Sequence, residues 1–172
     1  MTALNTFQFD GIELRPAATR DCALATEWTE QDPDHAGRVQ PKFWLSQGLA
    51  VDSYLVSDQQ GPLLFFRADL SVAKDRTRQC RIHMQFRPEP EAKGRTAIAI
   101  TKGLVWIELA LAPVVDELLF DSENESLIRF CVNRLGFVRE GDILRKRIVD
   151  HGGSRKETSD VRSDQRADPT PG

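Results

Sequence analysis

Alternating hydrophobic and polar positions predict a series of strands along the first half of the chain. Gly11–Arg15 reads GIELR, with Ile12 and Leu14 on one face, and Pro16 ends the strand. Three more strands follow, and the turn DQQG at Asp58–Gly61 predicts that the first two form an antiparallel hairpin. We expect these three strands at Asp52–Ser57, Pro62–Val72 and Gln79–Phe86.

Hydrophobic positions three and four residues apart predict helices between and after these strands. Thr19 is the expected N-cap of the first helix, and Ser122 that of the last. Gly136 is the expected left-handed residue at the end of the last helix. The expected helices are Arg20–Glu30, a short one that begins at Pro41, Thr96–Ala110 and Glu123–Leu135. The remaining expected strands are Val114–Phe120, Phe137–Glu140 and Ile143–Val149.

The order of these elements is strand, two helices, three antiparallel strands, helix, strand, helix and strands. A strand–helix–strand crossover in the second half implies one parallel strand pair, so the sequence predicts an α+β fold. The 172-residue length favours a single domain, over residues 1–149. Residues 150–172 read DHGGSRKETSDVRSDQRADPTPG, and their lack of hydrophobic residues predicts a disordered polar tail.

Composition narrows the classes of function. A net charge of -3 gives no basic surface for nucleic acid or an anionic membrane, and no hydrophobic run approaches the roughly 20 residues of a membrane span. Cys22, Cys80 and Cys131 lie far apart, without metal-ligand spacing, and the N-terminal residues MTALNTFQFD do not resemble a signal peptide. We therefore expect a soluble cytoplasmic protein without a bound metal, nucleic acid or membrane as partner.

The stretch Phe86–Ile100, FRPEPEAKGRTAIAI, joins the end of a strand to the start of a long helix. A helix N-terminus presents unpaired N–H groups and a partial positive charge, both of which suit a diphosphate. Gly94 allows the backbone to approach a phosphate, Thr96 offers a hydroxyl donor, and Lys93 and Arg95 add positive charge. The alternative is a strand-to-helix turn in which Gly94 relieves a tight bend.

The order of elements and two local motifs resemble the GNAT superfamily of acyl-CoA-dependent N-acyltransferases. The family's pyrophosphate loop reads Q/R-x-x-G-x-G/A; EAKGRT places Gly94 on its first glycine, Thr96 on its last small position, and Glu91 where Gln or Arg is usual. The second motif is the closing helix, which resembles the family's in having Asn124 near its start and ending in LGF, Leu135–Phe137.

The resemblance implies a central mixed, mostly antiparallel sheet with helices on both faces. It also implies acetyl-CoA or another acyl-CoA as co-substrate, and transfer of the acyl group to a primary amine of a small molecule or protein by direct attack. The alternative is a catalytically silent module with the same fold, used for protein interaction or assembly. The implied CoA-binding residues are Met84, Gln85 and Phe86, through their backbone, and Lys93, Gly94, Arg95, Thr96 and Asn124.

Many members of the family use a tyrosine on the closing helix to protonate the leaving thiolate, but Val132 stands at that position and Tyr54 is far away in the sequence. Cys131 is the neighbouring alternative, and a buried structural thiol is the competing reading. The expected base is His83, on one face of its strand with Gln85, or a carboxylate such as Glu117 that begins the adjacent strand. A purely structural role is the alternative for each.

The segment Gln31–Trp44, QDPDHAGRVQPKFW, combines acidic, imidazole and aromatic side chains. In the related fold the segment between the first two helices often forms a wall of the acceptor site, which assigns substrate binding to Asp34, His35 and Trp44. The DPDH sequence lacks the further ligands of a metal site. The alternative is a surface turn that two aromatic residues hold against the core.

Overall fold

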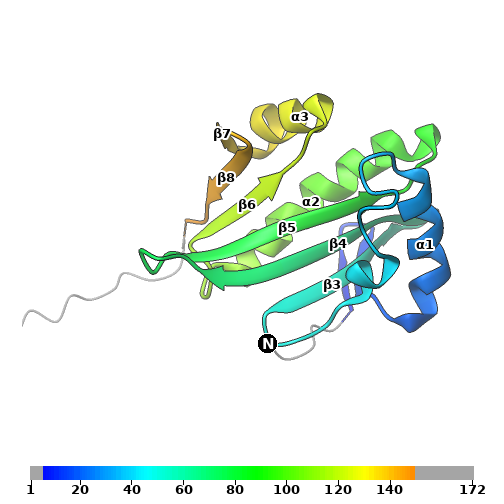
Figure 1. The fold of residues 1–172 in the computed structure, drawn as a ribbon, viewed down its shortest axis with the longest axis horizontal. Helices are drawn as coiled ribbons and strands as arrows, with labels where there is room; N and C mark the ends of the chain where they lie inside the picture. Colours follow the sequence, from blue (N-terminus) through cyan, green and yellow to red (C-terminus); the bar gives the residue numbers. More distant parts are fainter. Residues whose placement is uncertain (1–5, 150–172) are drawn as a thin grey trace, which may run out of the picture.

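A mixed eight-stranded sheet forms the centre of the structure, a computed structural model that describes residues 6–149 (Figure 1). The spatial order is β1-β2-β3-β4-β5-β6-β8-β7, and every neighbouring pair is antiparallel except β5 and β6, which are parallel. The predicted α+β class and its parallel pair are confirmed. The strands are β1 (Phe7–Phe9), β2 (Ile12–Pro16), β3 (Val51–Asp58), β4 (Gly61–Val72), β5 (Arg78–Phe86), β6 (Glu117–Asp121), β7 (Val138–Glu140) and β8 (Ile143–Arg147).

The sequence analysis missed β1, which pairs with β2 through a two-residue turn. Asp10 and Gly11 form this turn with φ angles of 48° and 79°, and Phe9 is paired with Ile12. An Asp-Gly pair favours such a turn because glycine adopts a positive φ without steric cost and aspartate tolerates it. The signal is therefore present in the sequence, in FQFDGIEL.

Three α-helices cover the sheet, with α2 and α3 on one face and α1 on the other (Figure 1). Their bounds are α1 (Cys22–Gln31), α2 (Lys93–Leu111) and α3 (Glu125–Leu135), and three 3-10 helices are η1 (Thr19–Asp21), η2 (Pro41–Leu45) and η3 (Pro90–Ala92). None of the helices of residues 6–149 combines the length and hydropathy needed to span a bilayer.

Some helix ends differ from those expected. Thr19 lies inside η1 and does not cap α1. The N-cap of α3 is Asn124, whose Oδ1 accepts hydrogen bonds from the backbone of the next turn, and Ser122 instead accepts one from the Asn124 N–H. Gly136 is left-handed, with φ 76°, as expected. The predicted tail lies outside the described residues.

Helix α2 begins one turn earlier than predicted. Residues Lys93–Thr96 therefore form its first turn, and do not form a loop before it. The strand after α2 begins later than predicted, at Glu117, because the N–H groups of Val114 and Val115 both bond the Leu111 carbonyl and prolong the helix end as a turn.

Period-two alternation gives the sheet two hydrophobic faces. On the face towards α2, Val56, Phe66 and Ile82 belong to the larger core. On the opposite face, Leu55 and Phe65 pack with aromatic residues of α1 and η2 in a smaller core. On the same face of β5, Arg81 and His83 remain partly exposed beside the smaller core.

Candidate functional site

The parallel pairing of β5 with β6 stops halfway along β5. The paired residues run from Gln79 with Glu117 to Ile82 with Phe120. Beyond them, His83–Phe86 pairs with β4 alone, and β6 ends at Asp121. We call His83–Phe86 the open seam, because its edge towards β6 lacks a described strand partner. Backbone N–H and C=O groups at such an edge are available to an extended ligand.

The first turn of α2 follows directly from the open seam through η3. No side chain caps η3 or α2, and Lys93 and Gly94 are exposed. A Cβ added to Gly94 would meet nothing within 4 Å, so this glycine leaves open space over the helix start. An uncapped helix start with a bare glycine beside it is a suitable place for an anion to reach the backbone.

The other two predicted phosphate-binding side chains point elsewhere. Arg95 donates to Asp58 in the β3–β4 turn at 2.7 and 2.5 Å, and this contact lowers the pKa of the Asp58 carboxyl. Thr96 is buried, and its Oγ1 has no hydrogen-bond partner among the described residues. Asn124, the last residue of the predicted set, caps α3.

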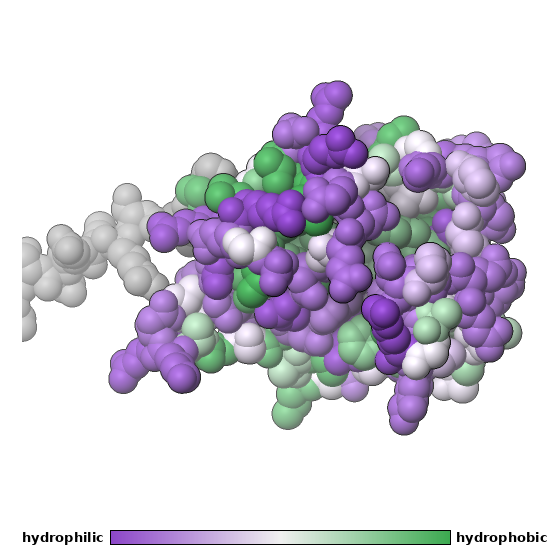
Figure 2. Space-filling view, turned by 45° about the horizontal axis from the view of Figure 1, so that its top comes forward, coloured by the Kyte–Doolittle hydropathy of each residue, from purple (hydrophilic) through white to green (hydrophobic). Residues whose placement is uncertain are grey.

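A small apolar cavity of about 30 Å³ lies under the sheet, on the side of α2 and α3. Ile82 and Phe120, the last paired residues of β5 and β6, line it together with Met84 and Cys131. Figure 2 shows a mostly hydrophilic surface with a hollow in which hydrophobic residues are visible. The cavity has room for a methyl-sized group and not for a long chain.

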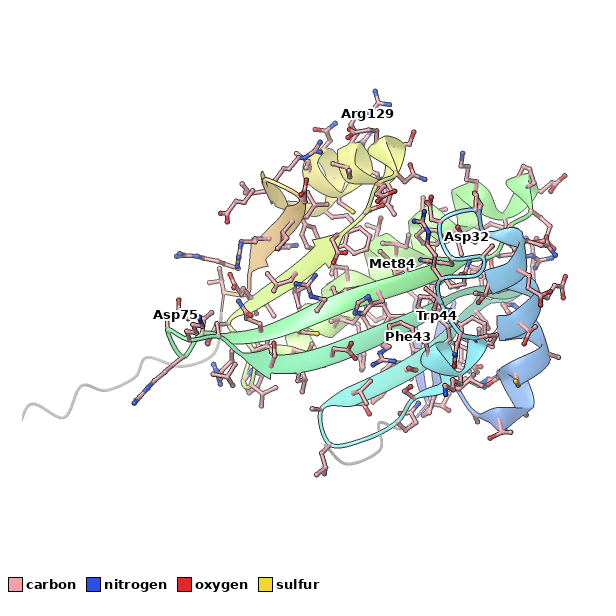
Figure 3. The ribbon with its side chains drawn as sticks, in the orientation of Figure 1. Asp32, Phe43, Trp44, Asp75, Met84 and Arg129 are labelled. Carbon is pink, nitrogen blue, oxygen red and sulfur yellow. The ribbon has the colours of Figure 1, made fainter. Side chains whose placement is uncertain are left out.

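On the opposite face of β5, the segment between α1 and η2 closes over the open seam. The fully buried Gln85 donates from Nε2 to Asp32 Oδ2 at 2.9 Å, and its Oε1 lies 2.7 Å from His35 Nδ1. The same His35 nitrogen lies 3.2 Å from Asp32 Oδ2. Figure 3 shows Asp32 above the end of β5 that carries Met84. The segment predicted to bind the acceptor thus contacts the strand predicted to bind CoA.

The other two residues predicted for that segment lie outside this network. Asp34 is exposed, and its N–H bonds Asp32 Oδ1 in a local turn. Trp44 is buried, donates from Nε1 to Thr29 Oγ1, and packs its ring 5.4 Å from that of His35. Trp44 therefore supports the segment from the core, as the structural reading of its aromatic residues expects.

His83 lies on the same face of β5 as Gln85, as the alternation predicts. Its Nε2 is 3.2 Å from Asp69 Oδ2, and Phe43 meets its ring edge-on. Arg67 stacks on the same Phe43 ring, with its guanidinium carbon 3.7 Å from the ring centre. Burial lowers the pKa of His83. His83 is thus held between a carboxylate and an aromatic ring.

The remaining catalytic candidates are further from the open seam or enclosed. Glu117 accepts hydrogen bonds from Gln79 at 2.6 Å and Arg145 at 2.7 Å, at the opposite end of the paired segment. Cys131 is buried on α3, and burial raises the pKa of its thiol to about 11. Tyr54 is buried on the α2 side of β3, and Val132 is partly exposed on α3. Among residues 6–149 there is no cluster of His, Cys, Asp and Glu that suits a metal ion.

Sequence reasoning placed Asp32 in the acceptor segment, but it assigned the binding role to Asp34. The i, i+3 spacing of Asp32 and His35, directly after the helix, was the available signal, because it brings the two side chains to one side of a turn. Their common partner, Gln85, is 50 residues from His35 in the sequence and carries no local signal.

No protein-family model matches the sequence. A search of curated proteins also finds no match. Solved structures do resemble the fold. The ribosomal-protein-S5-alanine acetyltransferase from Vibrio fischeri matches with a TM-score of 0.62 and 14% identity, over 87% of this chain and 100% of that one. A GNAT-family acetyltransferase from Streptococcus pneumoniae matches with a TM-score of 0.58 and 11% identity, over 80% and 99% of the two chains.

A third similar structure is NAA60 from Arabidopsis thaliana, in complex with acetyl-CoA. It matches with a TM-score of 0.60 and 15% identity, over 80% of this chain and 98% of that one. At these identities the likeness concerns the fold. The chain has the fold of the GNAT acetyltransferases, as the sequence motifs indicated.

Proposed function

We propose that this protein is an N-acetyltransferase that transfers the acetyl group of acetyl-CoA to a primary amine. The observation that supports this most is the open seam of β5, which leads directly into an uncapped helix start with open space over Gly94. The open seam followed by the start of α2 gives a binding surface for each of two parts of CoA, its pantetheine arm and its diphosphate. The extended pantetheine arm pairs with the strand edge, and the diphosphate meets the helix N–H groups.

Lys93 is the side chain best placed to add positive charge at the helix start, because it is exposed in the first turn. Arg95 is paired with Asp58, so its contribution to the site is to hold the β3–β4 turn against the start of α2. The small cavity beside Ile82 and Phe120 favours an acetyl group over a longer acyl chain. A solved structure of the same fold holds acetyl-CoA, which agrees with this choice.

The acceptor amine approaches on the other face of β5, where His35 and His83 lie. Direct attack requires a neutral amine and stabilisation of the developing oxyanion, and backbone N–H groups of the open seam are the available donors. The acceptor is an amine of a protein or of a small molecule. The name of the Vibrio fischeri enzyme specifies a ribosomal protein, which makes an exposed protein amino terminus the first acceptor to test.

A catalytically silent module is the second candidate, and two observations favour it. The position of the usual tyrosine holds Val132, and Arg95 is paired with Asp58 in the fold itself. Such a module retains the sheet but neither binds nor turns over acetyl-CoA. The two candidates therefore differ in a direct binding experiment.

Calorimetric titration with acetyl-CoA and with CoA tests the proposal. We expect saturable binding of both, a melting temperature that rises with ligand concentration, and release of CoA thiol when an amine is added. Gly94→Asp adds bulk and negative charge at the helix start and should abolish binding. Thr101→Asp adds the same charge to an exposed position about two turns along α2, and should bind like the wild type.

Two results would contradict the proposal. One is the absence of binding and of any melting-temperature shift at millimolar acetyl-CoA. The other is equal binding by Gly94→Asp and the wild type, which would place any CoA site away from α2.

A further inference from the structure

We propose that His35 is the general base of the transfer, with Asp32 and Gln85 as positioning residues. This inference rests on the proposed function and adds the residue that removes the proton from the acceptor. An alkylammonium or amino terminus is largely protonated at neutral pH, with a pKa of about 8 to 10, and must lose a proton before it attacks.

The hydrogen bonds around Gln85 determine the orientation of its side-chain amide. A carboxylate only accepts hydrogen bonds, so the group 2.9 Å from Asp32 Oδ2 is the Gln85 NH₂. The amide oxygen therefore faces His35 Nδ1, at 2.7 Å. Gln85 is fully buried, which leaves the amide little freedom to turn.

An amide oxygen also only accepts, so His35 Nδ1 must carry a proton. Asp32 Oδ2, 3.2 Å away, is a second acceptor for the same N–H. In the neutral ring this leaves the lone pair on Nε2, and Nε2 makes no hydrogen bond to any described residue. The His35 side chain as a whole is 25% exposed. A neutral ring fixed at Nδ1, with no protein hydrogen bond to Nε2 among the described residues, is suited to accept a proton.

A carboxylate lies beside the ring that accepts the proton. Asp32 is the carboxylate in contact with the ring, and it stabilises the imidazolium that forms when Nε2 accepts a proton. Gln85 of β5 and Trp44 of η2, which also contact the ring, are neutral. Asp32 and His35 thus form an acid–imidazole pair, and Gln85 fixes it to the strand that ends in the open seam.

The second histidine on this face is less suited to the role. His83 directs its Nε2 to Asp69, and Phe43 covers its ring edge. A neutral His83 that donates from Nε2 to Asp69 keeps its lone pair on Nδ1, so it forms a comparable acid–imidazole pair. His35 differs in having a second polar partner, because Gln85 also fixes its ring to β5, and we therefore assign the role to His35.

His35 Nε2 takes one proton from the acceptor ammonium, and the neutral amine then forms a C–N bond with the thioester carbon. The C–S bond breaks, and the CoA thiolate receives the second proton that the attacking nitrogen loses. The imidazolium returns its proton to water, so the products are an amide, CoA thiol and one proton.

Steady-state kinetics of His35→Ala and His35→Gln test this role, with short peptides bearing free amino termini and with spermidine as acceptors. We expect kcat/KM to fall by about 10²–10⁴-fold in both variants, with the affinity for acetyl-CoA unchanged. Added imidazole should restore part of the activity of His35→Ala. Asp32→Asn should lose about tenfold or more, and Glu30→Gln, which alters an exposed carboxylate near the end of α1, should match the wild type.

The outcomes separate this inference from the proposed function. A wild-type protein that neither binds acetyl-CoA nor acetylates any acceptor overturns both. A wild-type protein that is active while either His35 variant stays within about threefold of it overturns only the role of His35. Glutamine keeps the packing but cannot act as a base, so near-normal activity of His35→Gln would reveal a structural role. Failure of imidazole to restore folded His35→Ala would also contradict the base assignment.

Discussion

The guanidinium of Arg95 and the carboxylate of Asp58 lie 2.5 Å apart and join the first turn of α2 to the β3–β4 turn. Asp58 also accepts a hydrogen bond from the Gln60 N–H, so its carboxylate is the centre of that turn. The sequence predicts that Arg95 adds positive charge to a diphosphate site, but in the structure its charge is paired with Asp58. The two basic residues at the helix start therefore have different roles: Arg95 is paired within the fold, whereas Lys93 remains exposed.

Arg95 and Lys93 should respond differently to substitution. Arg95→Gln should lower the melting temperature and change the acetyl-CoA affinity by less than about threefold. Lys93→Gln should leave the melting temperature unchanged and weaken acetyl-CoA by about fivefold to tenfold, the value of one charge-assisted contact. Thermal melts and calorimetry measure both quantities.

The pH dependence provides a check on the Arg95 prediction. The pair lowers the pKa of Asp58, so its stabilisation is present above the unfolded value of about 3.9 and is lost as the pH falls through the folded value. The melting temperatures of Arg95→Gln and the wild type should therefore begin to converge as the pH falls below about 4, and should coincide once Asp58 is protonated in the folded protein. A stability difference that does not narrow at all between about pH 4 and about pH 2 would show that the pair is not its source.

Gly94→Ala should raise stability and impair binding at once. Alanine favours a helix over glycine by up to about 1 kcal/mol, and the added Cβ meets nothing within 4 Å. For a chain of this size, 1 kcal/mol corresponds to about 2–4 °C in melting temperature. The same methyl group occupies the space that a diphosphate needs, so acetyl-CoA binding should weaken. A variant that is more stable and binds equally well would show that the bare glycine has no ligand role.

The predictable part of the fold depends on local signals. The alternation of β3 to β5, the DQQG turn and the left-handed Gly136 each act within a few residues, and the structure confirms them. Helix α2 begins one turn before its predicted start at Thr96, although the glycine in its N-terminal residues, KGR, disfavours a helix.

The site could be predicted only in outline. The acceptor segment and β5 were identified separately, but the contacts between Asp32, His35 and Gln85 span 50 and 53 residues of sequence. The Arg95–Asp58 pair spans 37 residues. Such pairings depend on where two elements meet in space, and periodicity describes each element alone.

Asp52→Asn should stabilise the protein at neutral pH. Asp52 is buried on β3, its Oδ2 has no partner among the described residues, and burial raises the pKa of its carboxyl. Its folded pKa lies above the unfolded value of about 3.9, so its contribution to stability is fully present below that pH and is lost as the pH rises through the folded value. Asparagine cannot ionise and avoids that loss.

Thermal melts between pH 4 and pH 8 test the Asp52 prediction. Asp52→Asn should melt a few degrees above the wild type at pH 8, at about 2–4 °C per kcal/mol, and the gap should narrow towards pH 4. Glu30→Gln, at an exposed carboxylate, should follow the wild type throughout. A lower melting temperature for Asp52→Asn at pH 8 would instead reveal a partner that needs the charge.

The three cysteines should differ sharply in reactivity. Cys22 is exposed, whereas burial raises the pKa of Cys80 to about 12 and that of Cys131 to about 11. The thiolate is the reactive form, so at pH 8 iodoacetamide should modify Cys22 in the folded protein and the other two only after unfolding in urea. Mass spectrometry of the modified peptides gives the order in which the three cysteines react. Rapid modification of Cys131 in the folded protein would show that its thiol is accessible, and would favour its sequence-based role as the proton donor to the leaving thiolate.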